Sequence, residues 1–334
     1  MERIVDLAER LRQVDLFAHF SPAHLALLGE CASLGRFPSG VRVLKEGDAT
    51  SEAYVILDGR VRISRETAYG LYALATLERG EIFGETSFVD RNARSGDAVT
   101  EAATELVVLN PEALGAAMER DQRFTIALYW TFWKSLSRKL RATNQRLAQF
   151  FSQAAHRPPA APARPAHEEE GEFRVGMAAK RSLFQEQTLS AMEINFLATL
   201  SQEKKLEPGE IIFREGDPGD AMYIVLEGRV MISKFITGAG EEALAFLERG
   251  DYFGEMALID NDVRSADAKA DDGGAVVLRM PREIVEGILD INKVSSLRLL
   301  RLLCALVAKR LREVDDKIIG WHILAAGGGT LPSI

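Results

Sequence analysis

The chain has 334 residues, of which 47% are hydrophobic, and its formal net charge is −8. That apolar content is ordinary for a globular chain, and the length suggests two domains. The chain is acidic overall and has no block of basic residues. This disfavours a nucleic-acid-binding surface, because such a surface needs concentrated positive charge.

The cysteines and the N-terminus bear on cellular location. Cys31 and Cys304 are the two cysteines, and they offer neither a disulfide framework nor a metal-binding spacing. The N-terminal residues lack the apolar core of a signal peptide, and no run approaches the ~20 apolar residues of a membrane span. We therefore expect a cytoplasmic protein without a membrane segment, a metal or a cofactor.

The first predicted element is an amphipathic helical stretch over about residues 3–31. Short β-rich runs follow, and the chain becomes helical again after Pro111. Asp58-Gly59 separates Tyr-Val-Ile-Leu from Arg-Val-Arg-Ile-Ser, a pattern that predicts a β-hairpin. About six to eight such strands at short spacing predict an antiparallel barrel or jelly roll.

The second half of the chain repeats this order of elements. A helical stretch at about 180–201 precedes β-rich runs, and helix returns after Pro281. Residues 54–61 match residues 223–230 at an offset of 169, Pro111 matches Pro281 at 170, and Leu140 matches Leu311 at 171. A period of this size is that of a domain, so we interpret the chain as a duplicated domain rather than a solenoid.

The predicted fold class is α+β, with two β-roll (double-stranded jelly-roll) domains that are each flanked by helices. Domain 1 covers 1–151, domain 2 covers 177–322, and 323–334 form a short flexible tail. The segment 152–176 is rich in Pro and Glu, so we expect an exposed, semi-extended linker. A partner-docking segment is the alternative interpretation of this linker.

Each domain ends in a long helix with a heptad seam. Because a lone seam needs a partner helix, we favour pairing of the two seams over packing of each seam on its own barrel. The linker is long enough to return the chain, which gives an intramolecular pseudo-dimer, and a homodimer through the same helices is the competitor. The seam residues are Tyr129, Trp133, Leu136, Leu140, Thr143, Leu147 and Phe150, and Leu300, Cys304, Val307, Leu311, Val314, Ile318 and Trp321.

The strongest repeated motif is a short segment that ends in Phe-Gly-Glu. Residues 79–85 recur as 249–255, and an Arg-Ser pair follows nine residues after each final Glu, at Arg94-Ser95 and Arg264-Ser265. Each glycine, Gly84 or Gly254, lets the backbone approach a ligand closely. A structural ion pair alone would not explain why the spacing recurs in equal contexts.

The residue types in this motif suit a sugar phosphate. The carboxylates of Glu85 and Glu255 accept hydroxyl protons, and the planar forks of Arg94 and Arg264 match phosphate oxygens. The hydroxyls of Ser95 and Ser265 stand beside those forks. A short helical turn is expected to begin at Thr86-Ser87 and at Met256-Ala257, where free backbone amides suit an anion.

This arrangement resembles the phosphate-binding cassette of cyclic-nucleotide-binding domains, the superfamily of the catabolite activator protein and of cAMP-dependent kinase regulatory subunits. The resemblance implies that the Glu binds the ribose 2′-hydroxyl and that the Arg binds the cyclic phosphate. It also implies that Leu74 and Leu244 line the pocket. The sequence departs from the family at Asp97 and Asp267, where Thr or Ser is usual, and we expect both carboxylates to point outward.

The same resemblance assigns base contacts to the long helices. It places Thr143 and Asn144 at the contact positions in the first copy, and Val314 and Asp315 in the second. Thr-Asn is similar to an adenine-reading pair, whereas Asp315 could accept two protons from guanine, and we favour cAMP over cGMP. In a pseudo-dimer, Asn144 would reach site two and Asp315 would reach site one.

The output is expected to pass to an effector protein. About 13 residues follow Trp321, which leaves no room for a DNA-binding domain, and no nucleophile–base pair suggests an enzyme. We therefore predict a sensor that binds one nucleotide per domain and rearranges its C-terminal helices. The alternatives are a nucleotide-independent dimerisation scaffold with degenerate pockets and a DNA-binding regulator without its own reader, which the net charge disfavours.

Overall fold

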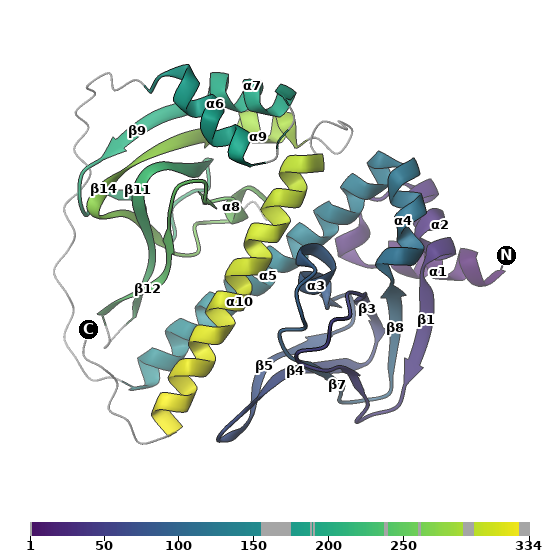
Figure 1. Cartoon of the computed structure of the whole chain (residues 1–334). Helices are drawn as coiled ribbons and strands as arrows, with labels where there is room; N and C mark the ends of the chain where they lie inside the picture. The colour runs from purple at the N-terminus through teal and green to yellow at the C-terminus, as the bar shows by residue number, and fades with distance from the viewer. Residues whose placement is uncertain are drawn as a thin grey trace. The chain divides into compact units, whose positions relative to one another are not determined.

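The structure, a computed structural model, describes residues 2–154, 175–187, 189, 191–236, 240–259, 262–289 and 297–326 (Figure 1). Most of the predicted linker, 155–174, and the end of the predicted tail, 327–334, lie outside the described residues. The chain divides into unit 1, Met1–Leu136 with Val307–Ile334, and unit 2, Ser137–Leu306. Each unit therefore contains the barrel of one repeat and part of the long helix of the other.

The helical stretch expected at the start of the chain is broken into three elements. These are α1 (Glu2–Arg12), a 3₁₀ turn η1 (Asp15–Phe17) and α2 (Pro22–Cys31). Ser21 caps α2, because its side chain accepts a hydrogen bond from the His24 amide at 3.1 Å, and Pro22 occupies the first helical position. A proline is favourable there because its missing N–H would have had no helical partner.

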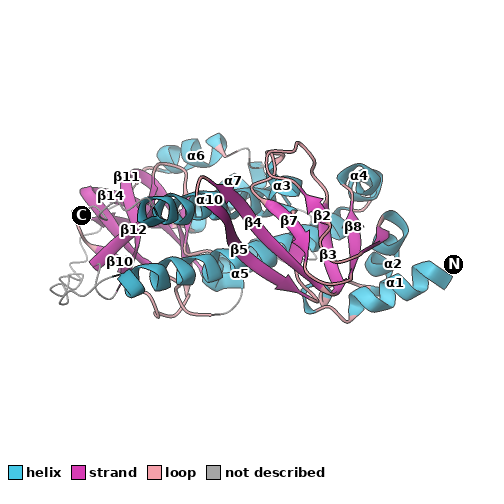
Figure 2. Ribbon diagram, turned by 90° about the horizontal axis from the view of Figure 1, so that it is seen from below, coloured by secondary structure: helices cyan, strands magenta, loops and turns pink. Residues whose placement is uncertain are grey.

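Two four-stranded antiparallel sheets form the barrel of unit 1 (Figure 2). A hydrophobic core cluster takes residues from both sheets, including Ile56 and Leu106 from one and Val61 and Leu77 from the other. The first sheet has the order β1 (Ser33–Phe37), β8 (Thr104–Leu109), β3 (Ala53–Asp58), β6 (Ile82–Phe83), and the second β2 (Arg42–Leu44), β7 (Asp97–Thr100), β4 (Arg60–Thr67), β5 (Gly70–Glu78).

The hairpin predicted at Asp58-Gly59 is wrong, because β3 and β4 belong to different sheets. Gly59 has φ +92°, and a Cβ there would lie 2.5 Å from Thr104 Oγ1 and 2.6 Å from Ala103 O. The glycine thus lets the chain cross from one sheet to the other where a second backbone passes close by. The hairpin of this region instead joins β4 to β5.

Unit 2 repeats this architecture with longer strands. The chain runs through Glu227-Gly228 inside one strand, β11 (Ala221–Ile236), whose register shifts on both sides of the pair. Strand β14 (Asp267–Pro281) likewise runs on where repeat one has two separate strands, β7 and β8. The other elements are α6 (Met177–Glu186), α7 (Ala191–Leu200), β9 (Gln202–Leu206), β10 (Ile211–Phe213), β12 (Gly240–Leu247), β13 (Tyr252–Phe253), α8 (Met256–Ile259) and α9 (Arg282–Ile288).

Long helices follow each barrel in the sequence. Repeat one has α4 (Pro111–Arg120) and then α5 (Gln122–Ala154), and repeat two ends in α10 (Leu297–Ala326). Helix α10 extends to Ala326, so residues 323–326 of the predicted tail are helical. No helix in the described ranges is long and apolar enough to cross a membrane. The seam positions Tyr129, Trp133, Leu136, Leu140, Thr143, Leu147, Leu300, Cys304, Val307, Leu311, Val314 and Ile318 are buried.

Candidate functional site

The repeated Phe-Gly-Glu motif places a glycine in a left-handed conformation at the start of a short helix. Gly84 has φ +77° and precedes α3 (Glu85–Asp90), and Gly254 has φ +76° just before α8. A Cβ on Gly84 would lie 2.7 Å from Glu52 O and 2.8 Å from Arg94 Nη1. The expected helical turn is thus confirmed in both copies, and glycine is required for the close approach of the arginine.

Arg94 is held at this turn by three different acceptors. Its Nη1 donates to Gly84 O at 3.0 Å, its Nε to Thr50 Oγ1 at 2.8 Å and its Nη2 to Glu52 Oε2 at 3.2 Å. Only 3% of the residue is exposed, and this burial lowers the pKa of the guanidinium. Because an arginine guanidinium stays protonated in proteins, Arg94 remains a buried cation at neutral pH.

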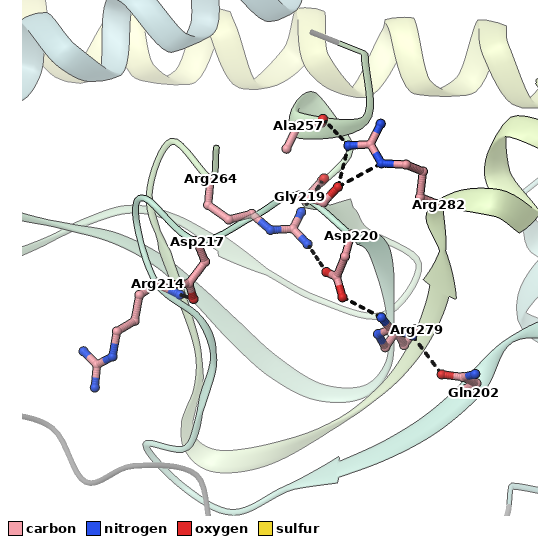
Figure 3. A network of polar contacts seen from close by, with 10 residues as sticks. Gln202, Arg214, Asp217, Gly219, Asp220, Ala257, Arg264, Arg279 and Arg282 are labelled. Carbon is pink, nitrogen blue, oxygen red and sulfur yellow. Dashed lines mark hydrogen bonds and ion pairs between the residues drawn. The ribbon is translucent and has the colours of Figure 1, made fainter. Parts of the chain in front are cut away.

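Arg264 occupies the equivalent position in unit 2 (Figure 3). Its Nη1 donates to Gly254 O at 2.7 Å and its Nη2 to Asp220 Oδ1 at 3.2 Å, and Asp220 also accepts from Arg279 at 2.7 Å. The guanidinium lies over the ring of Phe213, 4.3 Å from its centroid. Burial lowers the pKa of Arg264, and its buried Nε has no hydrogen-bond partner among the described residues.

The repeated Glu-Gly-Asp turn fixes the backbone of each arginine. In unit 1 the amide of Gly47 donates to Arg94 O at 3.0 Å, and the Arg94 amide donates to Asp48 O at 2.9 Å. The same pair of bonds joins Gly216 and Asp217 to Arg264, at 3.0 and 2.9 Å. These bonds explain why the turn recurs together with the arginine in the sequence.

Asp97 and Asp267 support the same turn rather than pointing outward as expected. The carboxylate of Asp97 accepts a hydrogen bond from the Glu46 amide at 2.7 Å, and that of Asp267 accepts one from the Glu215 amide at 2.6 Å. Asp97 is 8% exposed. The departure from the family pattern therefore supplies a carboxylate cap for the turn that holds the arginine.

The two predicted ribose-binding carboxylates are buried, with Glu85 1% and Glu255 2% exposed. Glu85 Oε1 accepts a hydrogen bond from Ser135 Oγ on α5 at 2.8 Å. The position that corresponds to Ser135 in repeat two is Leu306, which cannot donate a hydrogen bond. The two sites therefore differ in how this carboxylate is held.

The remaining cassette residues pack into the short helices. Thr86, Ser87, Met256 and Ala257 are all buried. In unit 2, Arg282 of α9 donates to Ala257 O at 2.9 Å and to Gly219 O, which ties the cassette helix to α9 (Figure 3). The equivalent residue in repeat one is Glu112, so this tie belongs to the second copy.

Leu74 and Leu244 occupy equivalent β-bulges. Each is the extra residue where the register shifts, between Ala73 and Ala75 on β5 and between Ala243 and Ala245 on β12. They are 5% and 6% exposed. A bulge changes the direction of its side chain relative to the regular strand. Because both repeats have a leucine at the bulge, the two barrels share the placement of this side chain.

The serines that follow the arginines are half-buried and are held through their backbone carbonyls. Ser95 O accepts a hydrogen bond from Arg65, and Ser265 O accepts one from Lys234 Nζ at 3.3 Å. The Ser265 hydroxyl lies 3.9 Å from Met256 Sδ. None of these three contacts uses a serine hydroxyl as a donor to oxygen.

The helix residues predicted to read the base fall in the unit of the other repeat. Thr143 and Asn144 belong to unit 2 and are 3% and 5% exposed, whereas Val314 and Asp315 belong to unit 1. Asn144 Oδ1 is buried without a hydrogen-bond partner in the part of the chain that the structure describes.

Several residues of the sites were missed by sequence reasoning, above all Glu52 and Asp220. Glu52 aligns with Ala221 and Asp220 aligns with Ser51, so the two carboxylates occupy neighbouring positions of the repeat rather than the same one. A comparison of the repeats therefore gave no signal for them. Within the described residues there is no cluster of three His, Cys, Asp or Glu side chains that could hold a metal.

The matches of this chain to a known protein family coincide with its two repeats. Residues 34–121 and 203–292, together more than half of the chain, match the family described as "Cyclic nucleotide-binding domain". The chain is 23% identical over 278 residues to cGMP-dependent protein kinase egl-4 of Caenorhabditis elegans, covering 83% of this chain but 29% of the kinase. It is 33% identical over 127 residues to the Cyclic AMP receptor protein of Thermus thermophilus, covering 38% of this chain and 56% of that protein.

Solved structures of similar fold include the regulatory domain of Toxoplasma gondii PKA with cAMP, at 18% identity and a TM-score of 0.33, with 89% of this chain and 95% of that one covered. A cyclic nucleotide-binding domain from Methylobacillus flagellatus shows 23% identity and a TM-score of 0.41, with 45% and 84% covered. With both of its repeats matched, the chain belongs to the cyclic nucleotide-binding domain family and carries two copies of that domain.

Proposed function

We propose that the protein is a sensor that binds one cyclic nucleotide in each domain, prefers cAMP to cGMP, and signals to a partner protein through its long helices. The observation that carries this proposal is the repeated buried arginine at a Gly-Glu turn. Arg94 and Arg264 are 3% and 2% exposed, and each is hydrogen-bonded to the carbonyl of its own cassette glycine.

A buried guanidinium is costly unless anions and hydrogen-bond acceptors surround it. The carboxylate that each arginine contacts, Glu52 or Asp220, is itself 26% or 60% exposed, so neither supplies a fully buried counter-charge. The Nε of Arg264, which has no partner in the described part of the chain, is a further donor that a ligand oxygen would satisfy. A cyclic phosphate, with one negative charge and two free oxygens, suits such a fork.

The adenine preference rests on the long helices. At the six-position, adenine presents an amino donor, whereas guanine presents a carbonyl acceptor. The buried Oδ1 of Asn144 is an acceptor without a described partner in unit 2, so it would pair with the adenine amino group. In unit 1 Asp315 is acceptor-only and could also take the two protons of a guanine edge, so site one is expected to discriminate less.

Isothermal titration of the purified chain with cAMP and with cGMP tests this function. We expect saturable binding of two cAMP molecules per chain, with cGMP weaker and the difference larger at site two. Bound nucleotide should also raise the melting temperature, because a ligand that binds only the folded state stabilises it. An absence of heat with both nucleotides and an unchanged melting temperature would instead favour the nucleotide-independent scaffold.

We further propose that the chain acts as an intramolecular pseudo-dimer. This proposal is supported by unit 1, which includes Val307–Ile334 from the end of repeat two as well as repeat-one residues. Light scattering after size-exclusion chromatography is then expected to give the monomer mass of 36.8 kDa with and without cAMP. Twice that mass at micromolar concentration would contradict the pseudo-dimer and indicate that the helices pair between chains.

A further inference from the structure

Within unit 1, one arginine of α10 binds both the cassette helix α3 and the residue just before Arg94. Arg312 Nη1 donates to Ala93 O at 2.9 Å, its Nη2 donates to Ser87 Oγ at 3.2 Å, and its Nε donates to Asp90 Oδ2 at 2.9 Å. The Arg312 side chain is 17% exposed. Residues 91–93 are exposed, so packing does little to fix them, and the hydrogen bond from Arg312 to Ala93 O helps to hold them.

Within unit 2, an arginine of α5 makes the equivalent contact. Arg141 Nη1 donates to Val263 O at 2.9 Å, and its Nε lies 3.8 Å from Asp262 Oδ2. Arg141 and Arg312 occupy the same position of the repeat, and so do Ala93 and Val263. Each acceptor carbonyl therefore belongs to the residue immediately before a predicted phosphate-binding arginine.

We propose that Arg312 and Arg141 are positioning residues for the two nucleotide sites, each supplied by the long helix of the other repeat. This inference rests on the proposed function of the sites. Anchoring the peptide before Arg94 or Arg264 limits the conformations of that arginine, which lowers the entropy lost when a phosphate binds. By reciprocity, a nucleotide that fixes this segment also favours the docked helix, so each site is linked to the other repeat.

A second contact of α10 strengthens the case at site one. Arg65 donates to Ser95 O, on the far side of Arg94, and is itself paired with Asp316 of α10. Helix α10 thus holds the backbone on both sides of Arg94, directly through Arg312 and indirectly through Arg65. The residue equivalent to Asp316 in repeat one is Gln145, so we expect the dependence on the helix to be stronger at site one.

The contacts differ from an ordinary exposed ion pair. An exposed pair such as that of Lys309 with Glu313, 3.7 Å apart, contributes little to stability and depends on charge alone. Arg312 and Arg141 instead each donate to a backbone carbonyl, which needs the planar fork at a fixed position. A lysine at either position keeps the charge but loses that geometry.

The test uses five variants: Arg312→Ala, Arg312→Lys, Arg141→Ala and two exposed-residue controls, Lys309→Ala on α10 and Arg138→Ala on α5. Each is titrated with cAMP in an Arg264→Ala background to isolate site one, and in an Arg94→Ala background to isolate site two. We expect R312A to weaken site one by about tenfold, an effect the size of one charge-assisted hydrogen bond, because the site loses its anchor but keeps its own ligand contacts. R312K should stay weakened, and site two and both controls should change less than about twofold.

R141A is expected to do the reverse and weaken site two. A loss at the site of the arginine's own repeat, equal losses at both sites, or full affinity in R312A and R141A would overturn the proposal. Hydrogen exchange of the nucleotide-free full chain supplies a readout that needs no ligand. There, R312A should speed exchange at residues 85–95 but not at 255–265, and R141A should show the opposite pattern.

If the wild-type chain bound neither nucleotide, the proposed function would fail while the exchange pattern would still decide whether these arginines hold the cassettes. Unchanged exchange in both segments would then refute the positioning role itself.

Discussion

Replacing Arg94 by alanine is expected to remove cAMP binding at site one and leave site two intact, and Arg264→Ala is expected to do the reverse. Each substitution deletes a buried cation that would otherwise face the phosphate. The expected loss is about 30-fold or more, in line with about 2–5 kcal/mol for truncating one partner of a buried charge pair. Calorimetric titration of the two variants beside the wild type measures both affinities.

The two substitutions differ in what they leave behind. Asp220 keeps its bond to Arg279, at 2.7 Å, when Arg264 is removed. Among the described residues, Glu52 is left with a weak contact to Asn110 Nδ2 at 3.4 Å when Arg94 is removed. Arg264→Ala is therefore the cleaner test, and its melting temperature without ligand should be close to that of the wild type. Arg94→Lys and Arg264→Lys are the matched controls, because they keep the charge but lose the fork. Wild-type affinity at both sites in the alanine variants would show that these arginines do not bind the phosphate.

Gly228→Ala is expected to produce the largest loss of folding stability, about 3 kcal/mol or more, because it adds a backbone clash to an unfavourable conformation. Gly228 has φ +73°, and a Cβ there would lie 2.2 Å from Gly274 O and 2.9 Å from Ala275 Cα. These neighbours belong to β14, which cannot move away without breaking its pairing with β11.

The matched control is Gly209→Ala in the same unit. Gly209 has φ +77°, but a Cβ there would meet nothing within 4 Å, so about 1–2 kcal/mol of backbone strain is the expected cost. Urea unfolding of both variants is followed by circular dichroism. Tryptophan fluorescence would report on the other unit, because Trp130, Trp133 and Trp321 all belong to unit 1. Equal losses in the two variants would show that the irregular pairing of β11 with β14 around Gly228 does not depend on glycine.

The crossing between the two sheets at Gly59 in unit 1 shows where sequence reasoning failed. Asp58-Gly59 has the composition of a hairpin turn, yet the flanking strands lie in different sheets. A glycine pattern specifies that the backbone adopts positive φ, but it does not specify which strand becomes the next neighbour. The outward orientation expected for Asp97 failed for a similar reason, because its partner, the Glu46 amide, lies 51 positions away.

The sequence by itself determined the duplication, the cassette and the position of its arginine, because these features depend on short-range spacing. Gly84 and Arg94 are 10 positions apart, and the same spacing separates Gly254 from Arg264. Only the tertiary structure decided that α10 supplies Arg312 to Ala93, 219 positions earlier in the chain. Heptad spacing identifies a helix face that must be buried, but many surfaces can bury it. The choice among them depends on the packing and polar contacts of residues that are distant in the sequence.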